Sequence, residues 1–138
     1  MAAPGPNTLD IERQTKIFRG ADGATMPKNR VVVNGPAAGD CQAPAGANAG
    51  SLAGVTYDAV KVGEGAALSE YAYQKVRIAG PIPIFSRVNV ADVQGRIKAV
   101  SEAAGTSVTL VGIAEEEGVQ ADQEIVVNLK RFGEQATA

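Results

Sequence analysis

The chain has 138 residues and a net charge of −2, which suits one domain with a sizeable core. It contains no His, no Trp and a single Cys, Cys41, so it lacks the material for His-based acid–base catalysis, Cys/His metal sites and an internal disulfide. The slightly acidic balance gives no broad attraction for nucleic acid or an anionic membrane, and no apolar run approaches the length of a membrane span. We therefore expect no enzyme, no cofactor, no metal and no membrane association.

The first predicted element is an extended N-terminal arm over residues 1–15, which opens with Pro and Gly. In an extended segment Leu9 and Ile11 point to the same side, so the arm could add a strand to the sheet edge of a partner. Leu9, Ile11 and Arg13 are therefore candidate partner-binding residues. The alternative is a disordered tail.

A single β-rich domain is predicted over residues 16–132. The chain has 16 Val and 8 Ile against 5 Leu, a bias that favours strands, and turn residues recur at short spacing, as in small sandwiches or barrels. Residues 60–70 and 90–94 are too short or too glycine-rich to decide between helix and loop. Residues 133–138 are small and polar and are predicted to fray as a C-terminal tail. Strands are predicted at residues 15–19, 30–33, 52–57, 71–78, 85–90, 96–100, 108–114 and 125–130.

The strand at residues 71–78 has the clearest alternation. One face carries Tyr71, Tyr73, Lys75 and Arg77, and the other faces the core. Alternating aromatic and basic side chains are typical of single-stranded nucleic-acid platforms, but in an acidic chain they also fit a protein interface. The residues predicted to be largely buried are Ile78, Val108, Leu110, Ile125, Val127 and Leu129.

Three further patterns resemble functional motifs but favour structural interpretations. Residues 115–117 are three consecutive Glu, which alternate between faces in a strand and therefore indicate a solvated acidic turn rather than a cation site. Residues 63–68 begin like a dinucleotide loop but lack the third Gly and a surrounding βαβ unit. Cys41 lies in a loop of small residues and is predicted to be a small apolar residue without a redox role.

The two halves of the chain show a weak internal repeat. Residues 30–33, 52–56 and 76–78 are followed, in the same order, by the similar segments 87–90, 110–114 and 125–127. We predict a small β-sandwich or barrel-like fold with a weak internal duplication, in which residues 61–73 are an insertion in the first half.

These segments resemble the small capsid decoration, or cement, proteins of tailed bacteriophages over about residues 16–129. The phrase Gly112-Ile113-Ala114, followed by the Val-rich strand at residues 125–127, matches the pattern of that family, whereas Gly54-Val55-Thr56 departs from it in the first half. The resemblance implies a β-rich protein with no catalytic residues, bound to the major capsid protein on the outer surface of the head. It also implies a homotrimer, a place in the virion and synthesis in the host cytoplasm.

Two other functions remain as alternatives to a decoration protein. A small β-barrel could bind single-stranded nucleic acid through Tyr71, Tyr73, Lys75 and Arg77, although direct nucleic-acid binding is not the expected role. An enzyme that uses carboxylates is the least favoured, because no local motif supports it. Salt-dependent oligonucleotide binding separates the first alternative from the decoration protein.

Overall fold

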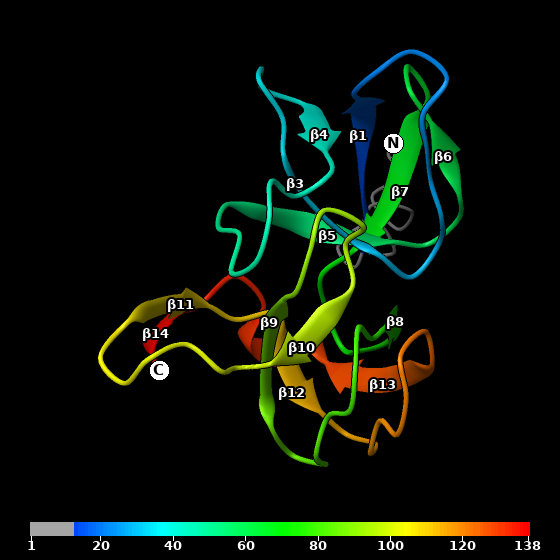
Figure 1. The fold of residues 1–138 in the computed structure, drawn as a ribbon. Helices are drawn as coiled ribbons and strands as arrows, with labels where there is room; N and C mark the ends of the chain where they lie inside the picture. Colours follow the sequence, from blue (N-terminus) through cyan, green and yellow to red (C-terminus); the bar gives the residue numbers. More distant parts are fainter. Residues whose placement is uncertain (1–12) are drawn as a thin grey trace, which may run out of the picture.

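The computed structural model describes residues 13–138, and two five-stranded sheets make up most of this part of the chain (Figure 1). The first sheet is a closed barrel in which β1 runs parallel to β4 and all other neighbours are antiparallel. The predicted all-β, barrel-like fold is therefore confirmed. In barrel order the strands are β1 (Arg13–Arg19), β4 (Asp40–Gln42), β3 (Val31–Asn34), β5 (Leu52–Thr56) and β7 (Gly65–Ser69).

The second sheet is antiparallel and bends back on itself. Its two outer strands meet at an isolated parallel bridge between Ile78 and Ile97, where the N–H of Ala79 donates to the Ile97 carbonyl at 2.9 Å. This bridge brings the sheet close to a second barrel. In sheet order the strands are β10 (Ile97–Ala99), β9 (Arg87–Val90), β12 (Gly112–Ala114), β13 (Glu124–Asn128) and β8 (Tyr73–Arg77).

Two small ribbons complete the described fold, together with a 3-10 helix over Leu129–Arg131. One ribbon pairs β2 (Thr25–Met26) with β6 (Val60–Lys61). The other pairs β11 (Ser107–Thr109) with β14 (Gln135–Thr137) and extends to one side of the molecule (Figure 1). The prediction that residues 133–138 fray is wrong, because residues 135–137 pair with β11, while Gly133 and Ala138 donate backbone hydrogen bonds to Leu110 and Thr106.

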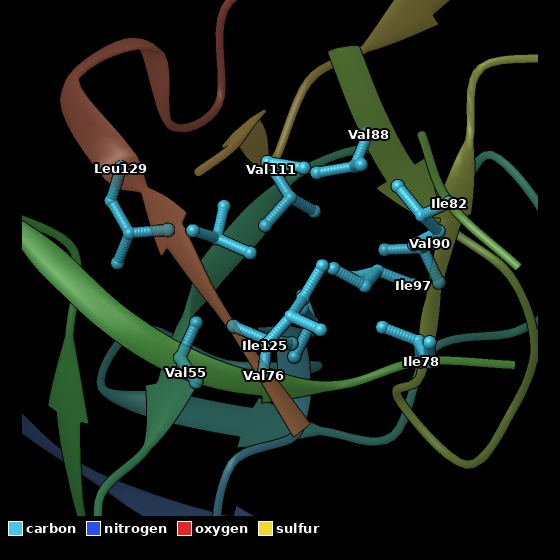
Figure 2. Close-up of a cluster of buried hydrophobic side chains, with 13 residues drawn as sticks. Val55, Val76, Ile78, Ile82, Val88, Val90, Ile97, Val111, Ile125 and Leu129 are labelled. Atoms are coloured by element: carbon cyan, nitrogen blue, oxygen red, sulfur yellow. The ribbon is translucent and has the colours of Figure 1, made fainter. Parts of the chain in front are cut away.

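Each sheet encloses its own apolar core, and β3 and β5 lie between the two. Val32 and Ala53 pack in the barrel with Phe18, Cys41 and Leu68. Figure 2 shows the second core, where the side chains from the second sheet converge with Val55 of β5. Val31 of β3 belongs to this second core as well. Neighbouring residues of one strand point to opposite faces, so two consecutive Val residues serve two cores. All six residues predicted to be buried are at most 1% exposed: Ile78, Val108, Leu110, Ile125, Val127 and Leu129.

The segment predicted to be an insertion, residues 61–73, contributes a barrel strand. It contains β7, which pairs with both β1 and β5 and so closes the barrel. A helix at residues 60–70, which the sequence left open, is replaced by β6 and β7. The sequence missed this strand because its residues, Gly-Ala-Ala-Leu-Ser, are weak strand formers that only pairing on both sides makes extended.

The repeated segments of the two halves share only part of their strand pairing. β3 pairs with β5 as β9 pairs with β12, which matches the predicted repeat. The third segment of the first half, β8, leaves the barrel and pairs with β13 of the second half. The two halves are therefore interlocked.

Within residues 13–138 no helix is long and apolar enough to cross a membrane.

Candidate functional site: exposed aromatic side chains and a small pocket

Tyr71 and Tyr73 form the aromatic part of the predicted binding face, and both point to solvent. Tyr71 is 47% exposed and Tyr73 is 62% exposed. They flank Ala72, which has a φ of 60° and whose carbonyl accepts a hydrogen bond from Leu129 N–H at 2.7 Å. The left-handed residue turns the chain between β7 and β8, so the two rings lie at the junction of the two sheets.

Arg77 is less available for binding than the sequence suggested. It lies directly opposite Glu124 in the β8–β13 pairing, and Nη2 of Arg77 is 2.9 Å from Oε2 of Glu124. Burial opposes ionisation of Glu124, but hydrogen bonds from Asn29 and Arg77 outweigh it and lower the pKa of this carboxyl. The stripe formed by Tyr71, Tyr73, Lys75 and Arg77 therefore has Lys75 as its exposed basic group. The charge of Arg77 is balanced within the fold by Glu124.

Most of the predicted arm, including Leu9 and Ile11, lies outside the residues that the structure describes. β1 begins at Arg13, which pairs with Ser69 of β7, so the last three residues of the predicted 1–15 arm belong to the barrel. Since Tyr71 follows Ser69 by two residues, the chain enters the barrel beside the exposed tyrosines.

The sequence did not single out the loop before β9, which exposes the largest apolar side chains. Phe85 is 67% exposed and Ile84 is 48% exposed. Phe85 was predicted to begin a strand, but it has a φ of 65°, a left-handed conformation that bulky residues rarely adopt. We call Ile84 and Phe85 the apolar knob. The signal that could have found it is the alternation of Pro and apolar residues at positions 81–85, which breaks the strand pattern.

The apolar knob is held by backbone hydrogen bonds on both sides. Ile82 and Gly118 exchange two hydrogen bonds of 3.0 and 2.8 Å, and the N–H of Phe85 donates to the Ala114 carbonyl at 2.7 Å. The Oγ of Ser86 donates to the Pro83 carbonyl at 2.7 Å. The loop therefore runs antiparallel to residues 114–118. The segment before β9 lies at the end of the molecule away from the barrel (Figure 1).

A pocket of about 380 Å³ lies where the turn between β9 and β10 meets the barrel. Val93 is on its rim and 55% exposed. Arg30 lines it and donates from Nη1 to the Gln94 carbonyl at 2.9 Å, while its buried Nε has no partner among the described residues. Arg30 also forms no ion pair with any of residues 13–138. The other lining residues are mainly apolar and include Phe18, Met26, Pro27 and Ala43.

Cys41 and the acidic turn show no functional arrangement. Cys41 is fully buried in β4 rather than in the predicted loop, and burial raises the pKa of its thiol. Among residues 13–138 no group of three or more acidic or Cys side chains is placed to hold a metal ion. Glu116 and Glu117 are exposed, and Oε1 of Glu116 accepts a hydrogen bond from Val126 N–H at 2.8 Å.

Residues 13–138 thus form a small all-β protein whose distinctive surface groups are aromatic and apolar side chains. No protein-family model matches the sequence, and a comparison with curated proteins finds no significant match. A solved structure does match: the N base of the head fiber gp8.5 in bacteriophage phi29. The TM-score is 0.64, the sequence identity is 15%, and the match covers 88% of this chain and 95% of that chain. At this identity the match shows a shared fold.

Proposed function

We propose that the protein is a structural component of a tailed-phage head. The observation that carries this proposal is the fold shared with the N base of a phage head fiber, over 88% of this chain. The resemblance of residues 16–129 to capsid decoration proteins supports the same assignment from independent features. In this proposal the protein binds the major capsid protein on the outer surface of the shell and bridges neighbouring capsid subunits.

The proposed role is non-enzymatic. The chain has no His, the side chain used most often in general acid–base catalysis, and its one thiol is buried with a raised pKa, so neither group is available for catalysis. A homotrimer on the capsid would present three copies of each exposed aromatic surface. Multivalent attachment would then hold under internal DNA pressure where one weak contact would not.

Co-sedimentation with phage heads that lack the protein tests the proposal. We expect the purified chain to sediment with mature heads and to saturate at a fixed copy number. We expect Tyr71→Ala and Tyr73→Ala together to reduce the copies bound, since aromatic side chains dominate many interfaces. A chain that stays in the supernatant with all heads tested would contradict the proposal.

Oligonucleotide binding tests the main alternative with the same protein. The charge of Arg77 is balanced by Glu124, so the stripe offers little to a phosphate backbone. We expect no measurable binding at physiological salt. Tight binding that falls steeply as salt rises would instead favour a single-stranded nucleic-acid function.

A further inference from the structure

We propose that the apolar knob of one copy of this chain inserts into the 380 Å³ pocket of a second copy, so that the protein self-associates through two different surfaces. The knob is Ile84 and Phe85, and the pocket lies between the barrel and the β9–β10 turn. The inference does not depend on the proposed function, because it rests on the shape and charge of the two surfaces.

The knob has the properties of a preformed interface anchor. Phe85 keeps a left-handed conformation and remains 67% exposed, so the chain tolerates both backbone strain and the hydration of a large apolar ring. Hydrogen bonds to Ala114 and Gly118 fix the loop before any partner is bound. Little conformational freedom is then lost when the knob is buried.

The pocket has a suitable size and lining for this knob. Its volume of about 380 Å³ is near the lower end of the range of ligand sites, which suits one or two side chains. Phe18, Met26 and Ala43 give it an apolar wall. Because Phe85 is largely exposed, the knob does not fill the pocket of its own copy.

Charge around the two surfaces is complementary. Residues 114–118 run alongside the knob, which places the exposed Glu116 and Glu117 next to it. Arg30 lines the pocket without a carboxylate partner among the described residues, and its Nε is an unpaired donor. Insertion of the knob would bring the carboxylate of Glu117 towards the positive charge of Arg30, which forms no ion pair among the described residues.

Different surfaces on the two partners give a head-to-tail contact. Such contacts close into a ring when the rotation between copies permits it, and otherwise extend. The closed form would be one way to build the proposed homotrimer, and its size follows from the sedimentation of the wild type.

A mixing experiment with two complementary variants tests the proposal. Phe85→Ala removes the aromatic ring of the knob, and Val93→Asp places a negative charge on the rim of the pocket, where it repels Glu117. Both positions are exposed, so both variants are expected to fold. In sedimentation velocity we expect the wild type to associate as concentration rises and each variant alone to remain monomeric. An equimolar mixture retains one intact knob and one intact pocket and should form a dimer of one copy of each.

Tyr57→Ala is the matched control, because it removes another exposed aromatic ring, 42% exposed, that belongs neither to the knob nor to the lining of the pocket. It should associate as the wild type does. The exchange of charges in Arg30→Glu with Glu117→Arg should restore association that Arg30→Glu alone weakens. A wild type that is monomeric at every attainable concentration, or a mixture that stays monomeric, would overturn the proposal. Head co-sedimentation of Phe85→Ala is measured separately, so retained binding leaves the proposed function standing when self-association is lost.

Discussion

Asn89 is the most deeply buried polar side chain of the second sheet, and it organises a small polar cluster. Its Nδ2 donates to Oδ1 of Asn48 at 3.2 Å and to Oε1 of Glu102 at 3.0 Å. Lys98 Nζ lies 2.8 Å from Oε2 of Glu102. Since Asn48 comes from the loop before β5, the cluster links the first half of the chain to β9 and to the segment after β10.

Glu102 gives this cluster a pH dependence. Burial opposes ionisation of its carboxyl, but hydrogen bonds from Lys98, Asn89 and the backbone N–H of Ser101 outweigh it and lower the pKa to about 2. A group whose pKa is depressed in the folded state stabilises the fold above its unfolded pKa of about 4.5, and this contribution is lost as pH falls towards 2.

Between pH 4.5 and 2, the free energy of unfolding should fall more in the wild type than in Glu102→Gln. We predict that the two decreases differ by an amount on the order of 3 kcal/mol. The variant should be less stable than the wild type at pH 7 and should approach it at pH 2. Urea unfolding at several pH values measures the difference between the two curves. Parallel curves over the whole range would show that Glu102 does not carry the dependence.

Gly112 is a second residue whose identity the fold dictates. A Cβ at this position would lie 2.2 Å from the Asn128 carbonyl oxygen, because β12 and β13 approach closely there. We predict that Gly112→Ala lowers the free energy of unfolding by about 3 kcal/mol or more. Gly80→Ala is the control, since nothing lies within 4 Å of its Cβ, and its effect should be much smaller. Equal stabilities of the two variants in chemical denaturation would contradict the close approach.

At the scale of elements, the C-terminal segment that contains β14 pairs with β11 and with Leu110. The N–H of Leu110 donates to the Glu134 carbonyl at 2.9 Å, and the N–H of Gly133 donates to the Leu110 carbonyl at 2.8 Å. Arg87 Nη1 donates to the Thr137 carbonyl at 3.0 Å, which ties β14 to β9 as well. Val108 of β11 and Leu110, which follows this strand, are both buried.

We predict that removing residues 135–138 lowers the free energy of unfolding by about 2–4 kcal/mol, because it exposes Val108 and leaves the backbone of β11 unpaired. Thr137→Val retains the strand and should unfold at nearly the wild-type denaturant concentration. If the truncated chain matched the wild type, the segment would contribute nothing to folding, as the sequence pattern had predicted.

At the scale of the whole molecule, β1 joins the end of the predicted arm to the barrel. Arg13 and Gln14 pair with Ser69 and Leu68 in the barrel, so a deletion that leaves the fold intact must stop at residue 12. We predict that removal of residues 2–12 leaves the thermal midpoint nearly unchanged and reduces the number of copies bound to phage heads, since Leu9 and Ile11 are lost.

Removal of residues 2–14 is the comparison variant, and it should lower the thermal midpoint because two barrel pairs are lost as well. Calorimetry measures the midpoints, and co-sedimentation measures the copies bound. Undiminished head binding after removal of residues 2–12 would show that the arm takes no part in attachment.

The site was predictable where it depends on local pattern and not where it depends on contacts between distant segments. Alternation along residues 71–78 correctly placed Tyr71 and Tyr73 at the surface and Ile78 in the core. It could not show that Arg77 would face Glu124, because that pairing joins residues 47 positions apart. The apolar knob was missed for a related reason, since the hydrogen bonds that hold its loop join it to residues 114–118, far away in the chain.

The sequence by itself determined the strand-rich class, the positions of most strands and six buried residues, four of which belong to the second core. These features were predictable because strand alternation is a local property with a period of two residues. It also determined that the chain has no His and one Cys. Only the tertiary structure decided that β7 closes the barrel, that β8 crosses to pair with β13, and that β14 covers β11. Strand pairing joins segments far apart in the chain, and the energy of each pairing depends on side-chain neighbours that a single segment does not contain.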